Sequence, residues 1–133
     1  MTLTTVLLAD DSRIFRALMA EVLRDHGLEV VEAEDGREAL DLALAQRPQL
    51  LILDGLMPLM SGFDVVTRVR EKAPDYLPVV FIVTAVYKSR RFESEARQQY
   101  RVDEYLEKPL EPDDLLSAIR SHFPELKARS ANR

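Results

Sequence analysis

Leu50-Leu-Ile-Leu53, followed directly by Asp54, is the stretch of the sequence that decides the fold. An uninterrupted apolar run of this length indicates a strand buried on both faces, and such strands are typical of parallel sheets. A second run of the same kind, Thr5–Ala9, ends at the acidic pair Asp10-Asp11. The sequence therefore predicts a parallel sheet with carboxylates at the ends of two of its strands.

The rest of the chain alternates between strand and helix patterns. Three further predicted strands are Leu28–Ala33, Pro78–Val83 and Asp103–Glu107. Predicted amphipathic helices begin near Ser12, Asp35, Ser61, Val86 and Pro112. Strict alternation of this kind predicts an α/β fold: a doubly wound, five-stranded parallel sheet with helices on both faces.

Local signals describe the first two helices in more detail. The helix from Ser12 to about Gly27 has an apolar stripe with Ile14, Leu18 and Val22, which we expect to face the core. Phe15, Met19 and Leu23 stand beside that stripe. In the second helix, Asp35 and Glu38 have the spacing of a capping box, so Asp35 is the predicted N-cap.

The composition excludes several classes of protein. The length of 133 residues fits one domain, and no apolar run approaches the length of a membrane span. The absence of Cys and the presence of two His argue against thiol catalysis and against a Cys- or His-ligated metal. A formal net charge of −5 argues against nucleic-acid binding by this chain. With no signal-peptide pattern at the N-terminus, we expect a cytoplasmic protein.

Polar side chains stand at the carboxyl ends of the predicted strands, where ligands of open α/β sheets bind. They are Asp10, Asp11, Asp54, Thr84 and Lys108. Carboxylates held close together repel one another, and a hard divalent cation such as Mg²⁺ removes that penalty. One of the acids would then act as nucleophile toward phosphorus, with Thr84 and Lys108 binding phosphoryl oxygens.

Each of these residues alone has an ordinary structural explanation. The pair Asp10-Asp11 could cap a helix, and Asp54 before a glycine could be a turn residue. Thr84 could be a plain strand-end hydroxyl and Lys108 a solvated surface lysine. Their joint placement at successive strand ends favours a functional site over these separate explanations.

Five motifs together look like a known family: Val6–Ser12, Leu51–Pro58, Ser61–Phe63, Val83–Ala85 and Tyr105–Pro109. In these motifs the chain resembles the receiver domain of two-component response regulators. The resemblance implies a receiver domain over residues 1–123, with a C-terminal tail or the start of a linker at 124–133. It also implies the flavodoxin-like strand order 2-1-3-4-5.

The resemblance assigns a role to each site residue. Asp54 would accept a phosphoryl group from a histidine kinase or a histidine phosphotransfer protein. The protein ligands of Mg²⁺ would be Asp10 (mainly through water), Asp11, Asp54 and the backbone carbonyl of Leu56. Thr84 and Lys108 would bind the phosphoryl oxygens, and Tyr105 would be an aromatic switch that swings inward on phosphorylation. The Lys108-Pro109 peptide bond is expected to be cis.

The implied function is a phosphorylation-dependent signalling switch, not an enzyme with an external substrate. Its output face would be formed by the fourth helix, fifth strand and fifth helix, and would bind a downstream effector protein or domain; homodimerisation is a further expectation. One alternative is an interaction module of the same fold that does not depend on phosphate. Another is a haloacid-dehalogenase-like phosphatase, which the absence of an acid at Leu56, two residues after Asp54, disfavours.

Two features depart from the family pattern. Arg101-Val102 stands where Gly-Ala is common, and the stretch from Thr84 to Lys108 is slightly long and unusually basic. The predicted helix in that stretch is either a solvated surface or a partner surface. The resemblance also places apolar Leu56 and Val86 beside the water that would hydrolyse an aspartyl phosphate.

Overall fold

The computed structural model describes residues 2–85, 98 and 100–126 of the chain. Five parallel strands form a single sheet in the order β2-β1-β3-β4-β5, which confirms the predicted topology. The strands are β1 (Thr5–Ala9), β2 (Glu29–Ala33), β3 (Leu50–Asp54), β4 (Val79–Thr84) and β5 (Glu104–Glu107). Each lies within about a residue of its predicted limits.

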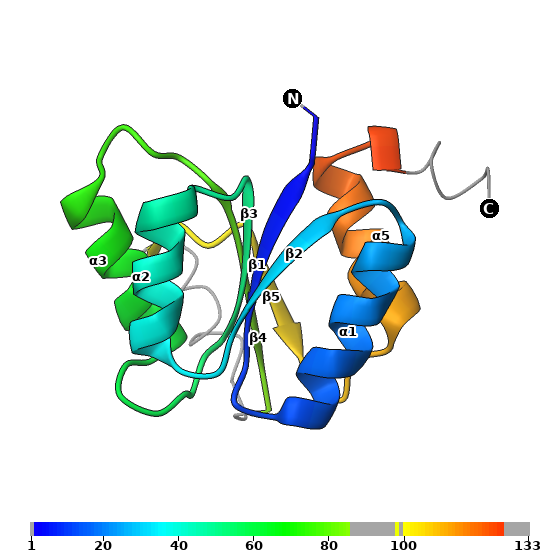
Figure 1. Cartoon of the computed structure of the whole chain (residues 1–133), viewed down its shortest axis with the longest axis horizontal. Helices are drawn as coiled ribbons and strands as arrows, with labels where there is room; N and C mark the ends of the chain where they lie inside the picture. Colours follow the sequence, from blue (N-terminus) through cyan, green and yellow to red (C-terminus); the bar gives the residue numbers. More distant parts are fainter. Residues whose placement is uncertain (1, 86–97, 99, 127–133) are drawn as a thin grey trace.

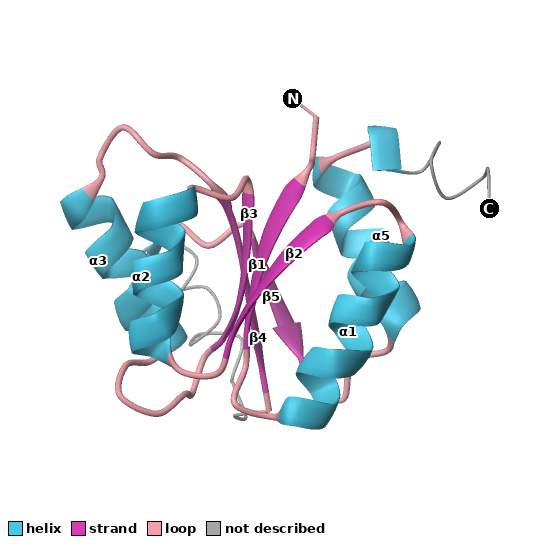
Figure 2. Cartoon of the chain, in the orientation of Figure 1, coloured by secondary structure: helices cyan, strands magenta, loops and turns pink. Residues whose placement is uncertain are grey.

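Helices cover both faces of the sheet (Figures 1 and 2). They are α1 (Arg13–Asp25), α2 (Gly36–Gln46), α3 (Gly62–Lys72) and α5 (Pro112–His122). Helices α1 and α5 pack on one face, and α2 and α3 lie side by side on the other. The predicted helix over residues 86–100 lies largely outside the described residues. Among the described helices, none combines the length and the apolar character that a membrane crossing requires.

The sheet separates two hydrophobic clusters, and alternate residues of each strand supply them. In β3, Leu51 and Leu53 belong to the cluster under α2 and α3, whereas Leu50 and Ile52 belong to the cluster under α1 and α5. All five residues of β3 are buried, as predicted for a strand covered on both faces. The second cluster also contains Leu126, which lies beyond the predicted domain end at residue 123.

The predicted core stripe of α1 is wrong by one residue. Ile14 and Leu18 are exposed, at 84% and 46%, whereas Met19 and Leu23 are fully buried. Two apolar stripes lie next to each other on this helix, so periodicity alone cannot say which of them meets the sheet. The packing of α1 against β1 and β2 selects the stripe that contains Met19, and Phe15 packs against the same cluster.

Three helices have a side-chain N-cap, and the predicted N-cap Asp35 is one of them. The side chains of Ser12, Asp35 and Ser61 each accept a hydrogen bond from the backbone N–H three residues later. The capping box of α2 is shifted, however, because Glu38 accepts from the N–H of Glu34 at 2.9 Å and not from the N–H of the N-cap. The start of α2 is therefore tied to the residue that precedes its cap.

Two glycines let the loop between β3 and α3 pack tightly. A Cβ atom at Gly36 would overlap the backbone carbonyl of Met60, and one at Gly62 would overlap the backbone carbonyl of Asp54. The N–H of Gly62 donates to the carbonyl of Gly55 at 3.2 Å. The loop that follows Asp54 is consequently held between the first turns of α2 and α3.

Candidate functional site

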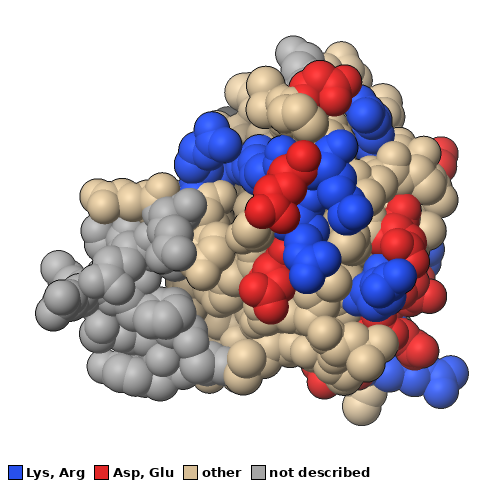
Figure 3. All heavy atoms as spheres, turned by 90° about the vertical axis from the view of Figure 1, so that its left-hand side faces the viewer, with Lys and Arg blue, Asp and Glu red and all other residues tan. Residues whose placement is uncertain are grey.

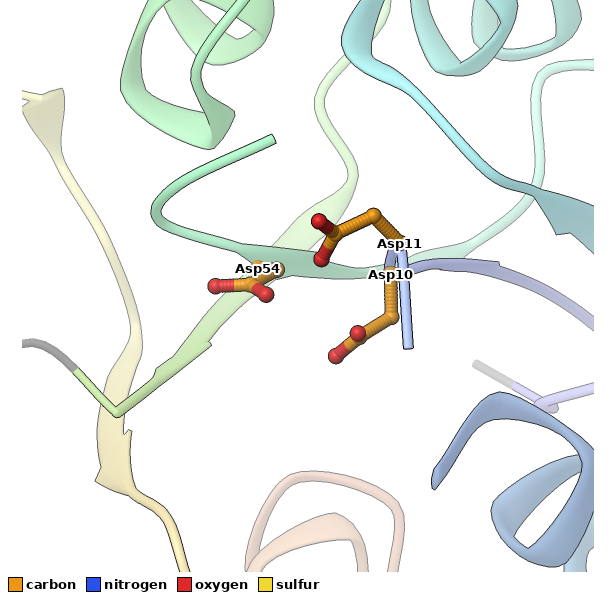
Figure 4. A group of neighbouring side chains, drawn as sticks. All are labelled: Asp10, Asp11 and Asp54. Carbon is orange, nitrogen blue, oxygen red and sulfur yellow. The ribbon is translucent and has the colours of Figure 1, made fainter. Parts of the chain in front are cut away.

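Three carboxylates converge at the carboxyl ends of β1 and β3. Asp10 and Asp11 follow β1, Asp54 ends β3, and the two strands pair directly, with Ala9 opposite Leu53. One oxygen from each of the three aspartates lies within 4.8 Å of the others, and Figure 4 shows the carboxyl groups turned toward one another. Asp10 and Asp54 are buried, whereas Asp11 is exposed. The predicted acidic trio is thus one cluster, open to solvent on the Asp11 side.

Lys108 carries the positive charge of this cluster. Its Nζ lies 2.7 Å from Oδ2 of Asp10 and 3.4 Å from Oδ2 of Asp54. The backbone N–H of Lys108 donates to the carbonyl of Thr84 at 3.0 Å, which fixes the lysine to the end of β4. One ammonium therefore contacts two of the three carboxylates of the cluster, those of Asp10 and Asp54.

The close packing of these charged groups shifts the pKa values of Asp10 and Lys108. Burial raises the pKa of Asp10, although hydrogen bonds from the Lys108 ammonium and from the backbone N–H of Ser12 work in the opposite direction. Burial also disfavours the charged form of Lys108, but its contacts with Asp10 and Asp54 outweigh burial and raise the pKa of the ammonium. The lysine stays charged, and a further cation would relieve the remaining carboxylate repulsion.

The donor set of the cluster suits a hard divalent cation. All three side chains offer carboxylate oxygens, which Mg²⁺ prefers, and the exposed Asp11 leaves room for water ligands. The backbone N–H of Leu56 donates to Oδ1 of Asp54 at 3.1 Å, so the loop that carries the predicted carbonyl ligand lies against the same aspartate. The arrangement therefore fits the expected Mg²⁺ site.

Thr84 and Tyr105 occupy neighbouring strands beside the cluster. Thr84 ends β4 with 1% exposure, and a Cβ atom at Gly55 would lie 3.2 Å from its Cβ. Tyr105 is opposite Ile82 in the ladder between β4 and β5. Its side chain is 6% exposed and packs in the cluster under α2 and α3, with its ring 6.4 Å from that of Phe63. Tyr105 therefore has a buried position in this structure.

The described residues test some of the remaining sequence predictions but not all of them. The cis peptide bond between Lys108 and Pro109 is confirmed. Leu56 is 60% exposed in the loop after Asp54, while Val86 lies outside the described residues. The basic predicted helix likewise falls mostly outside them.

The structure adds two residues that the sequence did not single out. The ring of Phe15 lies 4.4 Å from Nζ of Lys108, a cation–π contact. Arg16 donates from Nη1 to the backbone carbonyl of Asp10 at 2.6 Å and pairs with Glu32 at 3.2 Å. The Arg16 contact could have been predicted, because an arginine early in a helix that follows an acidic strand end can reach back to that strand end. The Phe15 contact could not, because it depends on which stripe of α1 faces the sheet.

Comparison with known proteins now identifies the family. Residues 6–120 match the model of the response regulator receiver domain. The chain belongs to this family. The structure agrees with this assignment, because it has five parallel strands in one sheet and an acidic cluster at their carboxyl ends.

Several relatives are similar to this receiver domain. Transcriptional regulatory protein PdtaR of Mycobacterium tuberculosis is 37% identical over 127 residues, covering 92% of this chain and 60% of the relative. Response regulator MprA of Mycolicibacterium vanbaalenii is 34% identical over 116 residues, covering 87% and 48%. Chemotaxis protein CheY4 of Vibrio cholerae has a similar structure, with a TM-score of 0.80, 32% identity and coverage of 90% and 98%. The chain spans about half the length of the curated relatives it matches.

Proposed function

We propose that this receiver domain is a phosphorylation-dependent signalling switch in which Asp54 accepts the phosphoryl group. The observation that carries the proposal is the convergence of Asp10, Asp11 and Asp54 on one point, with Lys108 bound to two of them. The donor would be the phosphohistidine of a histidine kinase or of a histidine phosphotransfer protein. The domain is regulatory, since its chemistry acts on its own side chain.

The proposed chemistry is a transfer between two side chains. A carboxylate oxygen of Asp54 attacks phosphorus, an O–P bond forms, the N–P bond of the phosphohistidine breaks, and the imidazole keeps the electron pair. Lys108, already near Asp54, stabilises the charge on the phosphoryl oxygens, and the Thr84 hydroxyl binds one of them. Asp10, Asp11 and Asp54, with the backbone carbonyl of Leu56, would hold Mg²⁺, and the bound ion would supply charge neutralisation.

The proposed output uses the strand next to the site. A phosphoryl group at Asp54 draws Thr84 toward it, which favours the buried position of Tyr105 over an outward one. Because Tyr105 lies on β5, this change would alter the face formed by β5, α5 and the segment before β5. A downstream effector protein or domain, or a second copy of the chain, would bind that face.

The test is phosphorylation by a small donor. With acetyl phosphate and Mg²⁺, intact mass spectrometry should show one phosphoryl adduct on the wild type and none on Asp54→Asn. Asp64→Asn is a matched control, because Asp64 is an exposed aspartate in the first turn of α3. It should still accept the group. An unmodified wild type would contradict the proposal and favour an interaction module that does not depend on phosphate.

A further inference from the structure

A groove of about 280 Å³ lies between α2 and α3, on the face of the molecule that is turned to the viewer in Figure 3. Its apolar lining comes from Leu40 and Leu44 of α2 and from Met60 of the loop before α3. Both leucines and the methionine also pack against the core cluster beneath them. The hydrophobic core therefore supports the apolar floor of the groove, and the groove is open to solvent.

Positive side chains border this floor. Arg37 comes from α2, and Arg68 and Lys72 come from α3. Arg37 already faces Asp41 at 3.8 Å, and both of these side chains are 67% exposed. Arg68 and Lys72 are exposed, and neither forms an ion pair with any residue in the described part of the chain. Two cations of α3 are thus available to a ligand.

The positive charge continues beyond the groove. Arg70, also on α3, donates to the backbone carbonyl of Arg101 at 3.1 Å, and both residues line a second hollow beside α3. Burial, and after it the charge of Arg101, lowers the pKa of Arg70, whereas Asp103 acts in the opposite direction. Figure 3 shows Lys and Arg side chains on this face with Asp and Glu side chains among them. The charged lining of the groove itself, Arg37, Asp41, Arg68 and Lys72, is positive on balance, whereas the formal net charge of the chain is −5.

We propose that the α2–α3 groove is a docking site for an acidic amphipathic helix of a partner protein. The apolar side chains of that helix would pack on Leu40, Leu44 and Met60, and its Asp or Glu side chains would pair with Arg68 and Lys72. Two helices that lie side by side form an elongated groove, and a third helix binds such a groove through apolar side chains on one face. The complementary charge sets the orientation and rate of association.

The lining favours a protein helix over a nucleic acid. Single-stranded nucleic acids bind through aromatic side chains on which the bases stack, and no aromatic residue lines this groove. The described residues that line the groove include none of Asp10, Asp11, Asp54, Thr84 and Lys108, although Met60 belongs to the loop that follows Asp54. Binding in the groove would therefore leave Asp54 accessible to its donor.

The test uses a fluorescently labelled helical peptide with Leu at positions i, i+4 and i+7 and Glu on both flanks. We expect it to bind the wild-type chain, with its amide-shift changes concentrated in α2 and α3. The double variant Arg68→Glu/Lys72→Glu should lose affinity by about tenfold or more, because attraction becomes repulsion. Arg13→Glu, an exposed charge reversal on α1, should change affinity by less than about twofold.

Two further measurements make the outcome decisive. Both variants should melt within a few degrees of the wild type and still accept phosphate from acetyl phosphate, which shows that they are folded. Equal peptide binding by the double variant and Arg13→Glu, or equal binding of a scrambled peptide of the same composition, would overturn the proposal. Tighter binding of a single-stranded RNA probe than of the peptide, lost in the double variant, would also overturn it.

Discussion

Leu56 lies in the loop after Asp54, and its backbone N–H donates to the Asp54 carboxylate. It follows Asp54 by two positions, is 60% exposed and cannot hydrogen-bond through its side chain. An apolar side chain here neither orients a hydrolytic water nor gives it a polar contact, so hydrolysis of an aspartyl phosphate should be slow but not abolished. Leu56→Asn should therefore shorten the lifetime of phosphorylated Asp54 several-fold. The measurement is loss of the phosphoryl adduct over time in Mg²⁺, by intact mass.

A matched variant tests whether polarity at this position matters. Leu77→Asn exchanges the same side chains at a residue that is 72% exposed in the connection before β4, away from the acidic cluster. Its decay rate should equal that of the wild type. If Leu56→Asn decays at the wild-type rate or more slowly, water access is set by other residues, and the assignment to Leu56 is wrong.

At the residue scale, the sequence predicts the site residues at strand ends better than the site residues that belong to helix α1. Asp10, Asp54 and Lys108 were placed together because the end of a strand is a local signal and parallel strands share one edge. Phe15 and Arg16 were not, because their contacts depend on the rotation of α1 about its axis. That rotation follows from packing against the sheet, which no local pattern records.

At the scale of elements, α1 shows how a correct helix can have the wrong buried face. Its limits agree closely with the predicted ones, yet Ile14 and Leu18 lie on the outside. Arg16 bonds to the end of β1 and to Glu32 on β2, so it fixes one side of α1 against both strands. The helix is positioned by a polar contact as well as by its apolar stripe.

This contact predicts a stability difference between two arginines of α1. Arg16 is 14% exposed and donates to the carbonyl of Asp10. Arg24 pairs with the same Glu32 and donates to the carbonyl of Val30 at 3.0 Å, but it is 50% exposed. Arg16→Met should lower the free energy of unfolding by about 1–3 kcal/mol, because it leaves a buried carbonyl without its donor. Arg24→Met should cost about 1 kcal/mol or less. Urea unfolding measures both, and equal losses would show that the Asp10 contact of Arg16 adds no more stability than the Val30 contact of the more exposed Arg24.

At the scale of the whole molecule, the acidic cluster lowers the stability of the metal-free domain. Its carboxylates repel one another in the folded state, and the proposed Mg²⁺ would bind only the folded chain, in which the three aspartates lie together. Millimolar Mg²⁺ should raise the melting temperature, with a gain of about 2.7 kcal/mol at a concentration one hundred times the dissociation constant. Asp11→Ala should lose most of this gain.

The control for this experiment is the same variant without metal. Asp11 is exposed, so its replacement removes a repelling charge without opening a cavity. In the absence of Mg²⁺, Asp11→Ala should be at least as stable as the wild type. A melting temperature that rises equally in both proteins on addition of Mg²⁺ would exclude Asp11 as a ligand.

The global topology was predictable for a different reason from the site. Alternation of strands and helices implies a parallel sheet covered on both faces, but the order β2-β1-β3-β4-β5 came from resemblance to receiver domains and not from periodicity. The order matters because it makes β3 and β4 neighbours and sets β5 beside β4. Asp54, Thr84 and Tyr105 therefore lie on three successive strands.

This succession predicts how a phosphoryl signal crosses the molecule. Beryllofluoride, a mimic of the phosphoryl group, should draw Thr84 toward Asp54 and increase the population of buried Tyr105, which is 6% exposed in this structure. The ring signals of Tyr105 and the methyl signal of Thr84 should both shift in NMR spectra when beryllofluoride and Mg²⁺ are added. Tyr76 is the internal control: it is 7% exposed, its hydroxyl donates to the carbonyl of Pro48 at 2.5 Å, and its signals should stay in place. Unchanged Tyr105 signals beside a shifted Thr84 would show that the signal does not pass from β4 to Tyr105, which contradicts the switch role of this residue.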